Sequence, residues 1–120
     1  MLDCVEMKPV VDIHKLVKAI GEIDGADEHK VFDAIRYKGC YGGNESYLEI
    51  SKSDILMGFF EDWDWIDTFR GIDINEFNAN WKEYMKRVDI NSISRKVDYR
   101  LVEMIDAGDL PRTFVVHVWW

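Results

Sequence analysis

The residues best suited to specific chemistry gather in one short stretch, residues 59–69, where aromatic rings alternate with carboxylates. The stretch reads FFEDWDWIDTF and contains Glu61, Asp62, Trp63, Asp64, Trp65 and Asp67. Residues 61–76 hold six acidic side chains and one basic side chain, a local net charge of −5. Tryptophan offers a large rigid contact area, and carboxylates attract the Lys and Arg side chains of a partner. The pattern therefore predicts a contact surface for a basic protein.

The same stretch has an alternative interpretation as an ordinary helix end. Its rings would then fill the core, while its carboxylates face water and pair with the basic residues of segment 82–100. That basic segment is itself interpreted as the solvated face of two helices. On one helical turn, Trp63 and Trp65 point about 200° apart. We therefore expect only one of the two rings to face outward, and the sequence leaves open which one.

Motifs for metal binding and catalysis are missing. Asp62, Asp64 and Asp67 have part of the spacing of a calcium loop, but the glycine and the closing glutamate of such a loop are absent. The three histidines lie in separate predicted elements, without the spacing of zinc ligands. We expect no metal, no cofactor and no catalytic residue. Cys40, with His117 or another histidine as base, is the one nucleophile considered.

The composition is that of one compact domain spanning residues 1–120. The chain has 23 acidic and 15 basic side chains, a net charge of −8 and 48% apolar residues. Such a chain can bury a core without metals or disulfides, and its acidity argues against direct nucleic-acid binding. No apolar run approaches the ~20 residues of a membrane span. Two cysteines and a start without a secretory pattern lead us to expect a cytoplasmic protein.

Hydrophobic spacing and capping residues predict about five helices. The first begins at Pro9 and ends near Gly21 or Gly25, and the second, shorter helix follows Asp24 to Asp27. Capping pairs at Ser51 and Asp73 predict the starts of two more helices. The helix after Asp73 has an unbroken apolar stripe from Ile74 to Val88, and the last helix spans residues 92–107. These helices must position the stretch described above.

The remaining segments predict a small antiparallel sheet. Residues 37–41 and 46–50 flank Gly42, Gly43 and Asn44, which indicates a central β-hairpin. The C-terminal residues 113–120 read TFVVHVWW, which is apolar on both faces and indicates a strand that is covered twice, or an edge that a partner covers. The expected fold class is α+β.

These observations give one leading hypothesis and two alternatives. The leading one is a non-enzymatic acidic protein that inhibits a basic nucleic-acid-handling protein by occupying its nucleic-acid groove, as immunity or phage anti-defence proteins do. Its contacts would be Glu61, Asp62, Trp63, Asp64, Trp65 and Asp67. The first alternative is a homo-oligomeric structural or regulatory module, such as a homodimer, joined through Val118, Trp119 and Trp120. The second is a small enzyme that uses Cys40 or a carboxylate pair.

Overall fold

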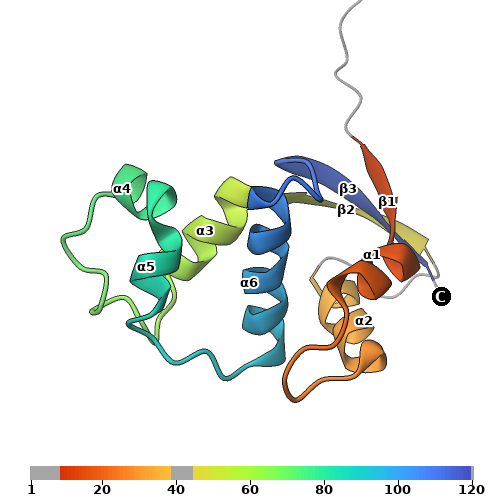
Figure 1. Cartoon of the computed structure of the whole chain (residues 1–120), viewed down its shortest axis with the longest axis horizontal. Coiled ribbons are helices and arrows are strands. Elements are labelled where there is room, and N and C mark those ends of the chain that lie inside the picture. The colour runs from red at the N-terminus through yellow and green to blue at the C-terminus, as the bar shows by residue number, and fades with distance from the viewer. Residues whose placement is uncertain (1–8, 39–44, 120) are drawn as a thin grey trace, which may run out of the picture.

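The computed structural model describes residues 9–38 and 45–119, which form a small α+β fold of six helices and a three-stranded sheet. The elements are β1 (Val10–Asp12), α1 (Ile13–Ile20), α2 (Glu28–Arg36), β2 (Glu45–Ser51), α3 (Lys52–Phe60), α4 (Ile74–Ala79), α5 (Trp81–Met85), α6 (Ile93–Asp106) and β3 (Thr113–Trp119). Figure 1 shows α1, α2 and α6 beneath the sheet, and α3, α4 and α5 on the other side of α6. The predicted fold class is confirmed.

Five of the six helices begin at a polar residue whose side chain accepts a hydrogen bond from a backbone N–H of the first turn. These residues are Asp12, Asp27, Ser51, Asp73 and Ser92. Such a cap satisfies one of the amides that a helix start leaves without a partner. The predicted caps at Ser51 and Asp73 are confirmed, because capping depends on local sequence.

Two predicted helices differ from the structure. Val10–Asp12, expected in the first helix, form β1 instead, and Asp12 is extended because it caps α1. The predicted helix from Ile74 is interrupted at Asn80, whose backbone leaves the helical region at φ −127° and ψ 29°. The side-chain amide of Asn80 also donates to the carbonyl of Glu76 at 3.3 Å. Asparagine competes in this way with helical hydrogen bonding, so the apolar stripe is divided between α4 and α5.

The sheet is mixed rather than purely antiparallel. Its strand order is β1-β3-β2, with β1 parallel and β2 antiparallel to β3. The predicted hairpin is not seen in the described residues: Tyr37 caps the end of α2 and the Lys38 amide bonds back to Ile35. Residues 39–44, which hold the rest of that hairpin, lie outside the described residues. The C-terminal strand β3 is the middle strand of the sheet, because it pairs with both β1 and β2.

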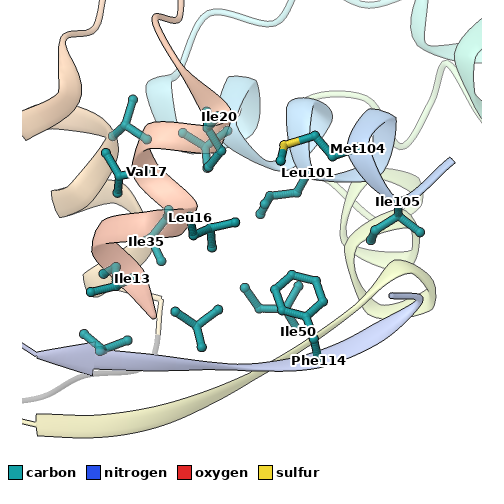
Figure 2. Packing of buried hydrophobic residues seen from close by; sticks show 14 of the residues in the cluster. Ile13, Leu16, Val17, Ile20, Ile35, Ile50, Leu101, Met104, Ile105 and Phe114 are labelled. Atoms are coloured by element: carbon teal, nitrogen blue, oxygen red, sulfur yellow. The ribbon is translucent and has the colours of Figure 1, made fainter. Parts of the chain in front are cut away.

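The first core cluster lies between the sheet and three helices. Phe114, Val116 and Val118 of β3 are fully buried on the face toward α1, α2 and α6. Figure 2 shows Phe114 and Ile50 beneath the side chains of α1 and α6. Alternation along β3 places the residues between these three on the opposite face.

The second cluster gathers most of the buried aromatic rings of the described residues and is separate from the first. It contains Leu56, Phe59, Trp65, Phe69, Phe77, Trp81, Met85 and Val102. Helix α6 contributes to both clusters, because Leu101 faces the first and the adjacent Val102 faces the second, both with no exposed surface. This helix therefore joins the two parts of the molecule.

One carboxylate ties three helices together at the C-terminal end of α6. Asp106 accepts hydrogen bonds from the Lys52 ammonium of α3 and, at 2.8 Å, from the Trp81 indole of α5. Partial burial acts to raise the pKa of Asp106, but the Lys52 and Trp81 hydrogen bonds outweigh it and hold the pKa below its usual 3.8.

Shortening Leu101 tests the role of α6. Leu101→Ala should lower the free energy of unfolding by about 2–5 kcal/mol, because it leaves a cavity in the first cluster. Urea denaturation followed by circular dichroism measures this change. Met57→Ala, at a side chain that is 40% exposed, is the control and should stay within about 0.5 kcal/mol of the parent. Similar losses for the two variants would contradict this role.

Asp106 predicts a specific pH dependence. A lowered pKa means that the carboxylate stabilises the fold above its unfolded pKa of about 3.9, and that this stabilisation disappears as the pH falls through the folded value. Asp106→Asn should therefore lower the melting temperature at neutral pH, with a difference from the parent that shrinks below about pH 4. The exposed Asp109 supplies the control, Asp109→Asn. A difference that is constant with pH would refute the assignment.

Candidate functional site

The predicted contact stretch lies in the segment of residues 61–73, which connects α3 to α4. Successive turns close along it: the Trp65 amide donates to the Asp62 carbonyl at 3.0 Å, and the Thr68 amide to the Trp65 carbonyl at 2.9 Å. The Ile72 amide donates to the Phe69 carbonyl at 3.1 Å. Hydrogen-bonded turns restrict the backbone, so this segment presents its side chains in a defined arrangement.

The two tryptophans of the segment face opposite ways. Trp63 is 89% exposed, whereas Trp65 is 9% exposed and its ring lies 6.1 Å from that of Phe59. Phe69 is also buried, so two rings that follow Trp63 in the chain hold the segment against the second cluster. The prediction that one ring faces outward is confirmed, and that ring is Trp63.

Asp62 does not belong to the outward surface. Its carboxylate lies 2.9 Å from the Arg95 guanidinium and its side chain is 14% exposed. The other carboxylate oxygen accepts the Asp64 amide at 2.9 Å. Asp62 therefore holds the segment in place and Trp65 fills the core, which corrects the expectation that both contact a partner.

Arg95 is the anchor, and the alternative interpretation of the sequence expected such a pairing only for the basic segment 82–100 as a whole. Its guanidinium lies over the rings of Phe59 and Trp65, at 5.5 and 5.9 Å from their centroids. Gly58 leaves room for it, since a Cβ there would lie 3.3 Å from the guanidinium. The sequence placed Arg95 on a solvated basic face, because no local spacing links it to Asp62.

A buried carboxylate extends this anchor into α6. Asp98 is 6% exposed and lies 2.6 Å from the Lys38 ammonium and 3.6 Å from the Arg95 guanidinium. A carboxylate in the interior is tolerated only when cations and hydrogen bonds compensate for its lost hydration. Lys38, Asp98, Arg95 and Asp62 thus form one chain of charges that runs from just after α2, through α6, to the segment.

Three carboxylates of the segment remain on the surface, as Trp63 does. Glu61, Asp64 and Asp67 are exposed, and Asp67 pairs with Arg70 at 2.8 Å. Both side chains of this pair are mostly solvated, so the pair adds little stability and leaves the carboxylate accessible. We call Glu61, Trp63, Asp64 and Asp67 the acidic-aromatic surface.

The residues expected at an oligomer contact lie at the end of β3. Val118 is fully buried in the first cluster, which corrects its assignment to a surface contact. Trp119 is 42% exposed, and Trp120 lies outside the described residues. Both edges of β3 pair with neighbouring strands along residues 115–117, so a second copy has no free edge to join there. Beyond His117 the described residues of β3 pair with β2 alone, so oligomerisation through the end of the C-terminal strand stays a prediction.

Metal ligands do not converge in the described part of the chain. Within residues 9–38 and 45–119, no group of three or more His, Cys, Asp or Glu side chains is placed to hold a metal ion. Cys40 lies outside these ranges, so its role as a nucleophile stays a prediction. None of the described helices combines the length and apolar composition that crossing a membrane requires.

The ion pair between Arg95 and Asp62 gives a prediction for the rigidity of the segment. Arg95→Met keeps the aliphatic stem but leaves Asp62 without its cation, so we expect a loss of about 1–3 kcal/mol. Hydrogen exchange at the Trp65 and Thr68 amides should accelerate. Arg70→Met is the matched control, since it removes the exposed pair with Asp67 and should cost under about 0.5 kcal/mol. Equal exchange rates in both variants would exclude Arg95 as the anchor.

Comparison with known proteins gives no match to a family model, a curated protein or a solved structure. The observations that bear on function are therefore geometric: an exposed indole, three exposed carboxylates of the same segment, and buried rings and an ion pair that hold it. Together they describe an exposed ring and exposed carboxylates on a segment whose backbone is held in place.

Proposed function

We propose that this protein functions by binding a basic protein partner through the acidic-aromatic surface. The observation that carries the proposal is Trp63, which is 89% exposed although the neighbouring Trp65 and Phe69 are buried. Burying a side chain of this size is worth roughly 1.5–3 kcal/mol to a complex. Tryptophans in such positions are among the residues that dominate binding energy at protein interfaces.

The rigidity of the segment supports the same proposal. Binding costs free energy for every side chain and loop that must become ordered. Here the turns of residues 61–73 are closed by hydrogen bonds, and the Asp62–Arg95 pair fixes the segment to α6. Trp63 is therefore presented to a partner with much of the ordering already complete.

Charge decides which partner fits. The three carboxylates of the surface lie in a region of local net charge −5 on a chain of net charge −8. Like charges across an interface repel each other. Opposite charges accelerate association, and added salt weakens their attraction. The partner then has a pocket for the Trp63 ring, surrounded by Lys and Arg.

The more specific form of the proposal is an inhibitor of a nucleic-acid-handling protein. Grooves that bind phosphates are lined with Lys and Arg and often hold aromatic rings that stack with bases. The carboxylates of Glu61, Asp64 and Asp67 would take the place of phosphates, and the Trp63 ring that of a base. Competition between this chain and nucleic acid for the partner distinguishes this form from simple association.

The test begins with capture of the partner at low salt, followed by titration of the purified pair. Trp63→Ala should weaken the complex about 30-fold or more, as loss of a central anchor does. The triple variant Glu61→Gln, Asp64→Asn, Asp67→Asn should slow association and flatten its salt dependence. Displacement of a DNA or RNA duplex from the partner would support the inhibitor form.

The control for these variants is Tyr37→Ala, at another exposed aromatic residue that is far from the segment in sequence and 64% exposed. It should change the affinity by less than about twofold, as most peripheral substitutions do. A partner that binds Trp63→Ala as tightly as the parent, or one whose affinity ignores salt, would refute the proposal.

A further inference from the structure

Strand β2 forms one edge of the sheet. The strand order is β1-β3-β2, and among the described residues no other strand pairs with the side of β2 that faces away from β3. The backbone N–H and C=O groups along such an edge are a template to which another extended chain can add by hydrogen bonding. The outer edge of β2 is therefore a candidate interaction surface.

A hydrogen bond at the end of the ladder shows which residues of β2 direct their backbone groups outward. The Lys52 amide donates to the Arg112 carbonyl at 2.9 Å, which continues the register of β2 and β3 by one residue. Because hydrogen-bonded and non-hydrogen-bonded pairs alternate along an antiparallel ladder, Leu48 directs its N–H and C=O toward β3. Tyr47, the residue before it, directs both groups away from β3.

This strand lacks the features that commonly protect an edge. Natural edge strands are very short, or they carry lysine, proline or a bulge that prevents another strand from pairing. The strand Glu45–Ser51 has 7 residues and contains neither lysine nor proline. Its register with β3 is unbroken over its whole length, so no bulge interrupts it. The edge is therefore long and regular enough for a further strand to add.

Apolar surface is incompletely covered on both faces of the sheet at the middle of β2. Leu48 points to the helix side and packs on the first cluster, but it is only partly buried. It also lines a cavity of about 200 Å³ together with Ile55 and Leu101. Tyr47, on the opposite face, is 64% exposed. A strand that pairs with β2 removes apolar surface from water on both faces.

We propose that two copies of this chain pair antiparallel through β2 and join their three-stranded sheets into one continuous sheet. The strand is self-complementary about a two-fold axis at Leu48. This register sets the two leucines opposite each other on the helix side and the two Tyr47 rings at diagonal positions on the outer face, within reach of each other. An axis at Glu49 would set two glutamates opposite each other, which destabilises a strand pair.

Charge gives this dimer a salt dependence opposite to that of a complex with a basic protein. Each copy carries a net charge of −8, so two copies repel each other and added salt screens the repulsion. The dimer should therefore tighten as the salt concentration rises, whereas a complex through the acidic-aromatic surface should weaken. The dimer does not rest on the function proposed above, and the opposite salt effects separate the two interfaces.

The experiment measures the dimer dissociation constant of the full chain by sedimentation velocity over a range of protein and salt concentrations. Tyr47→Pro removes an outward N–H and leaves the ladder with β3 intact, as prolines on edge strands do. It should weaken the dimer about tenfold or more relative to Tyr47→Ser, which removes only the ring, because each copy loses a hydrogen bond. Tyr37→Ser, at another tyrosine that is 64% exposed, is the matched control and should leave the dimer unchanged.

Hydrogen exchange of the parent chain is a second test that needs no variant. The Tyr47 amide should exchange more slowly as the protein concentration rises, because the dimer gives it an acceptor. Circular dichroism establishes that Tyr47→Pro is folded. A chain that stays monomeric at high salt, or a dimer that Tyr47→Pro leaves intact, would overturn the proposal. So would protection of the Tyr47 amide only when a basic protein is bound, since that protein would then occupy the edge.

Discussion

Helix α6 has to bury two of its faces at once, and the positions of all other elements follow from this constraint. Leu101 packs beneath the sheet while the adjacent Val102 packs among the rings of α3, α4 and α5. Neither half offers a large core by itself: a three-stranded sheet needs helices on one face, and two short helices need a surface to pack on. The sheet face and the 61–73 segment are therefore both held in place through one helix.

Charged groups at the two ends of α6 give this packing its specificity. Arg95 near the first turn reaches Asp62, and Asp106 at the last turn reaches Lys52 and Trp81. Burying charges costs hydration, and each partner lost leaves the other charge uncompensated. A different rotation of α6 would separate these pairs, so they favour the one arrangement in which Trp65 is buried.

What the sequence predicts correctly is local, and what it misses depends on contacts between distant residues. The caps at Ser51 and Asp73 need only a few neighbouring residues, and so both are found by pattern. The parallel pairing of Val10–Asp12 needs β3, which is distant in the chain, so local spacing predicts a helix for these three residues instead. Asp62 belongs to the same class, because only its pairing with Arg95 turns it inward. Residue spacing predicts that Trp63 and Trp65 face opposite ways, but it does not predict which of the two faces solvent.

The acidic-aromatic surface arises from an arrangement in which a buried ring fixes an exposed ring next to it. Trp65 fills the second cluster and so presents Trp63. The core is complete without the exposed indole of Trp63, which at 89% exposure adds little to folding stability. Removing Trp63 should consequently cost binding rather than stability, whereas removing Trp65 should cost both. A residue of a binding surface is expected to affect binding without affecting stability, whereas a core residue is expected to affect stability.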